Sequence, residues 1–527
     1  MIFRILARSR GLMRNAIEGL VVQPKVGRCA QNAYASLPKN FLTLKAFPDL
    51  LSGLVASKTA QLVLLLLVLG LCAVSNLPWH LDNYDQAKQA YVSYEIAHGG
   101  DWFYQHTPQG RTATKPPLAG WLCLPFYWIT GSWDLAWRLP SYLSTLVLLW
   151  LLAREARHVL PDCGTLLVIS AFGLNLLTPR IATLVRTDMM LTLWITLCGW
   201  LIYRKIDSGA PWAWSEKWAF FLGMLAAVLT KGPIPYAFLV PGMAVFWFLG
   251  PKDRRLLVWS GWWTWLLPLA LFLSWLLIGC STNPEFYNDV VVREFMSRFD
   301  QSLKAYEKQQ PIWFYFPHLL HKFAPWSLLA LALPIVSGNV RRKIKSDPGT
   351  LWLACWALGG LLCMTFVPSK RVDRIFPVIP PLCLLLVSMV SACQCGKRVR
   401  AWCGGAVVFA VLAVCGYFLT MAWMDYRNND DALVRFGREV QAVVKKAGIS
   451  EVGVVEGRDE PMIIYCDAGS YLRVNRAMRA WNNGDLDALV IPERRITNPG
   501  MLPPPTLDSG PISKQNETRY LLFLRSK

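Results

Sequence analysis

Charge is scarce in this sequence, and so are the motifs of several soluble protein classes. Only 17% of the 527 residues are Asp, Glu, Lys or Arg, compared with about 25% in typical soluble domains. The nearest cysteine pair, Cys393 and Cys395, has the spacing C-x-C, so neither a zinc site of the Cys-x-x-Cys type nor a disulfide framework is indicated. No RNA- or DNA-binding motif accompanies the net charge of +20, and we therefore expect no nucleic-acid partner.

Long hydrophobic runs are what the sequence has in abundance. Hydrophobic residues make up 54% of the chain and 25 residues are Trp. Runs close to the roughly 20 residues that cross a bilayer recur at 60–77, 136–153, 163–178, 188–203, 217–230, 233–249, 258–279, 313–337, 350–367, 374–392 and 403–424. These eleven runs predict a polytopic α-helical membrane protein with about 11–13 spans.

The basic residues between the runs predict the orientation. When the runs are threaded alternately, the connections on the side of the N-terminus are short and contain Arg154, Arg157, Arg204, Lys205, Lys217, Lys252, Arg254, Arg255, Arg341, Arg342, Lys343, Lys345, Lys397, Arg398 and Arg400. Lys and Arg accumulate on the cytoplasmic side of membrane proteins, so we expect a cytoplasmic N-terminus. The positive charge is interpreted as setting topology and meeting anionic membrane lipids.

Three regions follow. Residues 1–58 are a basic cytoplasmic tail, 59–427 a membrane domain whose first external loop is 78–135, and 428–527 an external soluble domain. Within the last region, 430–447 has helical spacing, and the apolar runs Val452–Val455, Met462–Tyr465, Ala488–Ile491 and Tyr520–Leu524 indicate strands of a small α/β domain. The apolar segment 116–131 has three prolines and four aromatic residues, which favours a helix lying in the membrane interface over a further span.

Ionisable residues that could do chemistry collect on the external side. Asp82 and Asp85 lie in the first external loop, and Asp188 lies at the mouth of an apolar run, where ionisable groups are usually functional. Asp85 has two interpretations that the loop alone leaves open. It is either a catalytic carboxylate or a residue that caps a helix beginning nearby.

An ordered set of short motifs resembles a known family. They are Asp85-Gln-Ala-Lys88, Gly100-Asp101-Trp102, Lys115-Pro116-Pro117, Arg186-Thr-Asp188, Leu229-Thr-Lys231-Gly-Pro233, Arg293-Glu-Phe-Met-Ser-Arg298-Phe299, Trp313-Phe-Tyr-Phe-Pro317 with Pro325-Trp326, and Ser369-Lys370 with Phe376-Pro377 and Pro380-Pro381. Together, over about 60–392, they resemble the GT-C superfamily of polyprenyl-phosphate-dependent glycosyltransferases, which includes the aminoarabinose transferases to lipid A and the protein O-mannosyltransferases.

The resemblance implies an inverting transfer of a sugar from a polyprenyl-phosphate carrier to an acceptor hydroxyl or phosphate outside the membrane. The acceptor would be a glycolipid such as lipid A, a protein or a cell-wall polymer. Asp85 matches the catalytic base, with Asp188 as a second catalytic carboxylate. The donor phosphate would be bound by Lys88, Lys115, Arg298, Lys370, Arg371 and Arg374. A bacterial inner membrane is the implied location.

Two departures from the family concern metal. The aminoarabinose-transferase branch has Glu where this chain has Thr114 and His where it has Phe295, and both positions are associated with metal binding there. Their replacement makes zinc doubtful. Asp82, Asp85 and Asp188 could still hold Mg²⁺ or Mn²⁺, which prefer oxygen ligands. The chain also has Gln86 where the family has an acid, and Arg371-Val372-Asp373 where the family has an apolar–Pro–Thr–Tyr run. These changes suggest a donor or acceptor other than aminoarabinose and lipid A.

Two other functions remain open from the sequence. A transporter or flippase of a lipid-linked sugar would use similar membrane spans, although no convincing internal repeat is visible. An inactive relative that serves as a scaffold would also tolerate the loss of the usual metal-position residues.

Overall fold

The computed structural model describes residues 53, 57–79, 81, 84–298, 310–393, 397–428, 432–449, 452–456, 461–496, 499–511 and 519–525. The N-terminal tail predicted for 1–58 therefore falls almost wholly outside the described residues, as does Asp82. All statements below refer to the described part of the chain.

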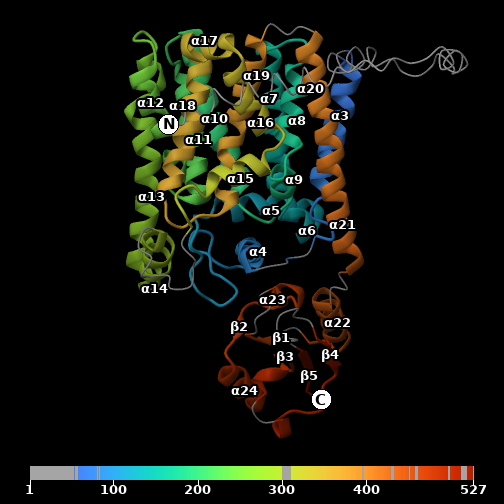
Figure 1. Cartoon of the computed structure of the whole chain (residues 1–527). Coiled ribbons are helices and arrows are strands. Elements are labelled where there is room, and N and C mark those ends of the chain that lie inside the picture. The colour runs from blue at the N-terminus through green and yellow to red at the C-terminus, as the bar shows by residue number, and fades with distance from the viewer. Residues whose placement is uncertain are drawn as a thin grey trace, which may run out of the picture. The chain divides into compact units, whose positions relative to one another are not determined.

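Helices dominate the membrane domain and lie side by side in a bundle (Figure 1). Six segments are long and apolar enough to cross a membrane: Trp133–Val159, Asp188–Ser208 (α10), Arg255–Thr282, Pro348–Phe366 (α18), Val372–Ala392 and Val399–Tyr426. Four of them join consecutive elements, namely α6 (Trp133–Ala136) with α7 (Leu139–Val159), η2 (Arg255–Val258) with α13 (Trp262–Thr282), η6 (Val372–Val378) with α19 (Ile379–Ala392), and α20 (Lys397–Ala410) through η7 (Val411–Cys415) to α21 (Gly416–Asn428).

The other predicted runs are also helical but shorter. They form α3 (Lys58–Val74), α8 (Gly164–Gly173), α11 (Trp214–Lys231), α12 (Ile234–Leu249) and the pair α15 (Tyr315–Lys322) and α16 (Trp326–Val336). The pair bends by 102°. Its break contains Pro325, which lacks an N–H and restricts the residue before it. Short connecting helices are α9 (Thr178–Ala182), α14 (Pro284–Phe286), η3 (Tyr287–Phe295), η4 (Met296–Arg298) and α17 (Gly338–Ser346).

Among the described residues six helical segments are long and apolar enough to span by themselves, or seven if the bent pair counts as one span. The remaining predicted runs form shorter or more charged helices, such as α8 with 10 residues and α11 with 18 residues, three of them charged. The expected total of 11–13 spans stays a prediction. The polytopic α-helical fold itself is confirmed.

The first predicted external loop contains two helices joined by a small hairpin. α4 spans Tyr84–Ala97 and α5 spans Leu118–Thr130. Between them, His106 pairs with Thr112 in an isolated antiparallel bridge, and the N–H of Thr107 donates to the carbonyl of Arg111 (2.7 Å). The 13 residues of α5 extend about 20 Å, too short to cross a bilayer, which agrees with the prediction that this segment does not span.

The C-terminal region forms a five-stranded sheet of order β2-β1-β3-β5-β4, with the helices α22 (Ala432–Lys446), α23 (Met462–Tyr465) and α24 (Val474–Asn483) and the short turns η8 (Glu493–Arg495) and η9 (Pro499–Met501). The strands are β1 (Val452–Val455), β2 (Tyr471–Leu472), β3 (Ala488–Pro492), β4 (Leu507–Asp508) and β5 (Tyr520–Leu524). β1 pairs in parallel with β2 and β3, whereas β5 is antiparallel to β3 and β4. The predicted strand at Met462–Tyr465 is wrong, because this run is α23 and follows Pro461.

The C-terminal region contacts α4 directly. The hydroxyl of Tyr94 donates to Oδ1 of Asp467 (2.7 Å), and the hydroxyl of Tyr91 donates to the carbonyl of Gly469. Both tyrosines are buried in a hydrophobic cluster shared with residues of α22, β1 and β5. The C-terminal region thus contacts the middle and later part of α4 at Tyr91 and Tyr94.

Candidate active site

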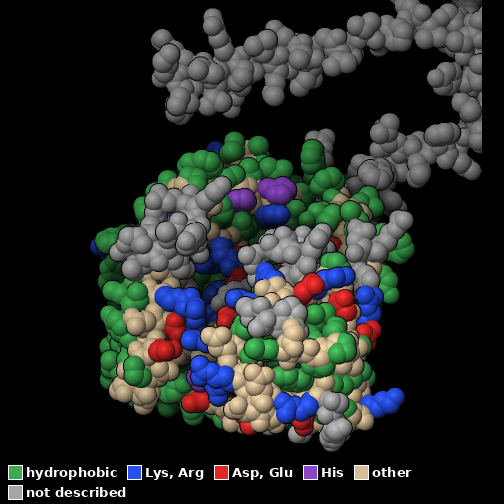
Figure 2. Space-filling model, turned by 90° about the horizontal axis from the view of Figure 1, so that it is seen from below, with side chains coloured by type: hydrophobic (Ala, Val, Ile, Leu, Met, Phe, Trp, Pro, Cys, Tyr) green, Lys and Arg blue, Asp and Glu red, His purple; other side chains and the backbone are tan. Residues whose placement is uncertain are grey.

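Charged side chains from six segments of the chain line one cavity of about 350 Å³. The segments are α4, the hairpin and loop before α5, the start of α10, the end of α11, η3 and the start of η6. The lining residues are Asp85, Lys88, Gln89, Thr107, Arg111, Thr112, Thr114, Lys115, Arg186, Asp188, Lys231, Asp289, Arg293, Glu294, Arg371, Asp373 and Arg374. Figure 2 shows that basic and acidic side chains are numerous on the face seen from below, whereas hydrophobic side chains line its left edge.

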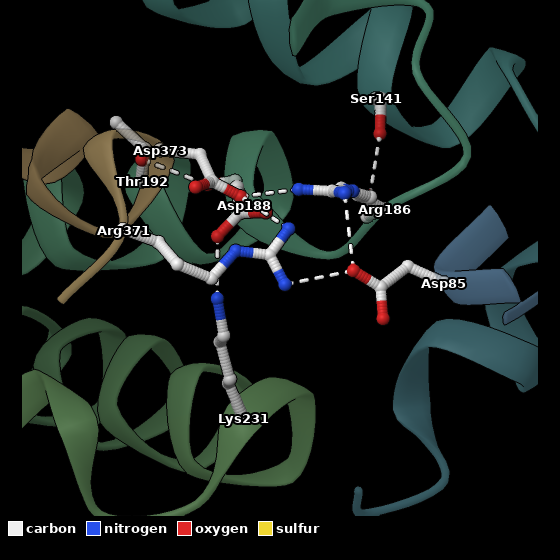
Figure 3. A network of polar contacts seen from close by, with 8 residues as sticks. All are labelled: Asp85, Ser141, Arg186, Asp188, Thr192, Lys231, Arg371 and Asp373. Atoms are coloured by element: carbon white, nitrogen blue, oxygen red, sulfur yellow. Dashed lines mark hydrogen bonds and ion pairs between the residues drawn. The ribbon is translucent and has the colours of Figure 1, made fainter. Parts of the chain in front are cut away.

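Two arginines connect two carboxylates in this cavity (Figure 3). Asp85, in the first turn of α4, accepts from Arg186 (3.1 Å) and from Arg371 (2.7 Å) through its Oδ2 atom. Both arginines also form ion pairs with Asp373. The first loop, the turn before α10 and the loop before α19 are therefore tied together by charge.

This network determines the protonation state of Asp85. Burial alone would raise the pKa of its carboxyl, but the hydrogen bond from Arg371 and the charges of Arg371, Arg186 and Lys115 lower it below its ordinary value. The carboxylate is therefore ionised at neutral pH. Because its hydrogen bonds go to arginines, and because it lies inside the first turn, its role is not that of a helix cap alone.

A second carboxylate is paired deeper in the bundle. Asp188 is the first residue of α10 and forms an ion pair with Lys231, the last residue of α11. Each charge complements its own helix dipole, since an anion is favoured at a helix N-terminus and a cation at a C-terminus. The side chains are only 6% and 10% exposed, so both charges depend on the pair.

Lys231→Met is expected to destabilise the protein by about 3 kcal/mol or more, because it leaves the Asp188 carboxylate buried without its cation. Thermal unfolding of the detergent-solubilised protein measures this. Adding Asp188→Leu to the same chain should restore most of the lost stability, since the buried charge is then gone. Equal unfolding temperatures for the Lys231→Met variant and the wild type would contradict the dependence.

The structure brings most of the predicted phosphate-binding cations to the cavity. Lys88 follows Asp85 on α4, and Lys115 precedes the two prolines at the start of α5. Arg374 lines the cavity and donates to the carbonyl (2.6 Å) and hydroxyl (2.9 Å) of Ser369. Lys370 does not line it, because its amine points to the carbonyl of Gln310 at 3.4 Å.

Lys115 has an environment suited to an anion. Burial and, after it, the nearby charge of Lys231 lower the pKa of its amine to about 8. The surroundings of Lys115 therefore disfavour its charged form, and a negative ligand in the cavity would stabilise that form.

Two predicted site residues cannot be placed. Asp82 and the side chain of Arg298 lie outside the described part of the chain. Roles predicted for them stay predictions.

Binding of a divalent cation stays a prediction, because Asp82, one of its three predicted ligands, lies outside the described residues. Among the described residues, no group of three or more His, Cys, Asp and Glu side chains is placed to hold a metal. Asp85 and Asp188 are each paired with a cation, which a metal would have to displace. Phe295, at the position where the family has His, packs its ring 5.8 Å from that of Phe272.

The sequence interpretation missed several cavity residues. Neither Arg186 nor Lys231 was predicted as a site residue. In the structure Arg186 pairs with Asp85 and Asp373, and Lys231 pairs with Asp188. Both had a signal in the quoted motifs. Arg111 and Thr107 had none, because only the fold of the hairpin brings them to the cavity.

Comparison with known proteins finds similarity to lipid-dependent glycosyltransferases. No family model matches it. It is 27% identical over 353 residues to an undecaprenyl phosphate-alpha-4-amino-4-deoxy-L-arabinose arabinosyl transferase from Erwinia tasmaniensis, covering 64% of this chain and 61% of that one. An equally named protein from Yersinia pestis is 27% identical over 326 residues, covering 60% of this chain and 56% of the relative. The chain thus matches about three fifths of the length of these curated relatives.

Solved structures share the fold. ArnT from Cupriavidus metallidurans, bound to undecaprenyl phosphate, has a TM-score of 0.64 at 16% identity, covering 89% of this chain and 99% of that one. The archaeal oligosaccharyltransferase AglB from Archaeoglobus fulgidus, in complex with an inhibitory peptide and a dolichol-phosphate, has a TM-score of 0.50 at 11% identity, covering 82% and 69%. The chain therefore has the fold of ArnT, which agrees with the fold expected from the sequence resemblance, and it is an integral membrane protein.

Proposed function

We propose that this protein is an inverting glycosyltransferase that moves a sugar from a polyprenyl-phosphate carrier to an acceptor. One observation carries the proposal: a single cavity contains the ionised Asp85 together with more cations than carboxylates. Transfer from a lipid phosphate needs a base for the acceptor and positive charge for the leaving phosphate. The similarity to undecaprenyl-phosphate aminoarabinose transferases supports the same reaction class.

In the proposed reaction, the acceptor oxygen attacks the anomeric carbon while the bond from that carbon to the phosphate oxygen breaks. Asp85 takes the acceptor proton, and the polyprenyl phosphate leaves with its negative charge. Lys115, Lys88 and Arg374 are placed in the cavity to stabilise that charge. Asp188 acts through Lys231, whose amine it holds at the cavity wall.

Donor binding also strengthens the base in this scheme. Arg371 bridges Asp85 and Asp373, and its charge is one cause of the lowered pKa of Asp85. A phosphate that neutralises Arg371 and Lys115 removes part of that cause. The pKa of Asp85 then rises, and the carboxylate accepts a proton more readily when the donor is in place.

The proposed setting is a bacterial inner membrane, with a cytoplasmic N-terminus and an external cavity and C-terminal domain. The basic connections of the sequence support this orientation. The acceptor is a glycolipid, a protein or a cell-wall polymer. A requirement for Mg²⁺ or Mn²⁺ stays a prediction, and the reaction as written contains no step through a metal.

Release of polyprenyl phosphate from radiolabelled polyprenyl-phosphate sugars tests the proposal, with purified full-length protein, candidate acceptors, and parallel samples containing EDTA. Acceptor-dependent release supports it, and loss of release in EDTA that Mg²⁺ or Mn²⁺ restores establishes the metal. Donor binding without release from any donor overturns it in favour of a scaffold. Movement of labelled lipid across vesicles without release favours a flippase.

The kcat/KM of the reaction is expected to fall about tenfold per pH unit above pH 8. The pKa of Lys115 is lowered to about 8, so its amine is charged below that pH and neutral above it, and only the charged amine attracts the donor phosphate. The acid limb should lie below the ordinary Asp range, because the pKa of Asp85 is lowered. A pH profile measures both. In a Lys115→Arg variant the alkaline limb should move upward, since guanidinium stays charged; an unmoved limb would assign it to another group.

A further inference from the structure

The charge balance of the cavity restricts which sugar it accepts. Its described lining contains eight Lys and Arg side chains against five carboxylates, an excess of three positive charges. A phosphodiester donor brings one negative charge. The cavity therefore remains positive with the donor bound, and a positively charged sugar would be repelled.

The carboxylates are also committed to cations of the protein. Asp85 and Asp373 pair with Arg186 and Arg371. Asp188 pairs with Lys231, and Asp289 pairs with Arg293. Glu294 also takes part in an interaction within the protein. An ammonium group on the sugar would have to break one of these pairs to obtain a counter-charge.

One wall of the cavity offers neutral hydrogen-bonding groups instead. Gln89 lies one helical turn after Asp85 on α4, and Thr107, Thr112 and Thr114 lie on the hairpin and the loop that follows it. Glu95 of α4 holds the hairpin in place. Its carboxylate accepts from the backbone N–H of His106 (2.6 Å) and contacts the imidazole ring of His106 (2.7 Å). This wall is therefore a defined surface rather than a loose loop.

Thr107 adds a group that lacks a partner. Its side chain is buried, and its hydroxyl has no hydrogen bond within the described structure. Buried hydroxyls are nearly always satisfied. A rotation of Thr107 about χ1 exchanges the positions of hydroxyl and methyl between staggered wells, so the hydroxyl can turn to a ligand that enters the cavity.

We propose that the sugar transferred carries no positive charge and is recognised through its hydroxyl groups by Thr107, Thr114 and Gln89. The inference rests on the proposed glycosyl transfer and specifies its donor. It separates this chain from relatives named for a 4-amino sugar. Hydroxyl and amide side chains both donate and accept hydrogen bonds, as sugar hydroxyls do.

A panel of three donors tests the charge of the sugar: polyprenyl phosphate linked to a neutral hexose, to a 4-amino pentose and to a uronic acid. With full-length protein, kcat/KM for the neutral donor should exceed that for the amino donor by about tenfold or more. A higher value for the amino donor than for the neutral donor overturns the inference while leaving glycosyl transfer intact, whereas use of the uronic acid donor agrees with the positive cavity. No release from any donor overturns glycosyl transfer itself.

A charge change at the neutral wall tests the reason for the preference. Thr114→Glu adds a carboxylate to the cavity and should shift the ratio of amino to neutral donor use toward the amino donor by about tenfold. Thr114→Gln has nearly the same size without the charge and should leave the ratio unchanged. Equal ratios in the two variants would overturn the electrostatic argument.

The hydroxyl contact of Thr107 is tested with singly deoxygenated hexose donors. Thr107→Val should lower kcat/KM for the full hexose about three- to tenfold, the usual effect of one hydrogen bond, whereas Thr107→Ser should retain it. One deoxy donor should lose activity with the wild type and show no further loss with Thr107→Val. Thr130→Val, on the exposed face of α5, is the matched control. Equal losses for every donor would assign Thr107 a structural role and overturn its part in recognition.

Discussion

Replacing Asp85 by Asn is expected to lower turnover by about 10²- to 10⁴-fold, the range that a positioned base contributes. The same change should tighten donor binding, because Arg186 and Arg371 lose the carboxylate that both of them contact and become freer to attract phosphate. Single-turnover release of labelled polyprenyl phosphate measures the first effect, and equilibrium binding of the donor measures the second.

This opposite movement of turnover and affinity distinguishes catalysis from misfolding. A misfolded variant loses both turnover and affinity, whereas loss of the base lowers turnover and strengthens donor binding. Asp253→Asn is a suitable control, since Asp253 is 71% exposed and pairs with its neighbour Arg254 in a connection away from the cavity. Wild-type turnover by a folded Asp85→Asn protein would contradict the assignment of Asp85 as the base.

Lys115→Met is expected to lower kcat/KM by about 10²- to 10³-fold, because it removes a cation from the half-buried wall where the leaving phosphate gathers charge. Lys115→Arg should keep a large part of the activity. The exposed Lys252, in a connection between α12 and α13, provides Lys252→Met as a control for lost positive charge.

Separate measurements of kcat and KM show whether Lys115 acts in donor binding or in the chemical step. If Lys115 binds the phosphate equally in donor and transition state, KM rises and kcat is unchanged; if it acts on the leaving group, kcat falls. We expect the fall in kcat, since the phosphate gains charge only as its bond to the sugar breaks. An unchanged kcat/KM would remove Lys115 from the phosphate site.

Helical regions of the membrane domain could be predicted from the sequence because apolar length is a local property. Each of the eleven apolar runs coincides with helix in the structure, and the short α5 agrees with the interpretation drawn from its prolines and aromatic residues. The breaks within the runs could not be predicted as well, because where a helix ends depends on its neighbours. The run 313–337 is continuous in hydrophobicity yet bends by 102° between α15 and α16.

The C-terminal region shows the same limit at smaller scale. β1, β3 and β5 lie where the β-branched and apolar runs indicate strands. Met462–Tyr465 has a similar composition but forms α23, and a run of four residues carries no periodicity that separates the two structures.

The cavity could be predicted only in part, for a different reason. Asp85, Lys88 and Lys115 belong to motifs that the resemblance singles out, and the structure brings them to one cavity with Asp188, Arg371 and Arg374. Which charge pairs with which is a property of the assembled helices. The ion pairs of Arg186 with Asp85 and of Lys231 with Asp188 join residues 101 and 43 positions apart in the sequence. Over such separations, the spacing of residues gives no information about which charges pair.

α4 is gripped at Tyr91 and Tyr94 by the C-terminal region, while Asp85 extends from its other end into the cavity. The C-terminal region contributes no residue to the cavity lining that the structure describes, yet it contacts the helix that does. Under the proposed function, mutations in the last hundred codons that loosen α4 would lower transfer while leaving every described side chain of the cavity unchanged.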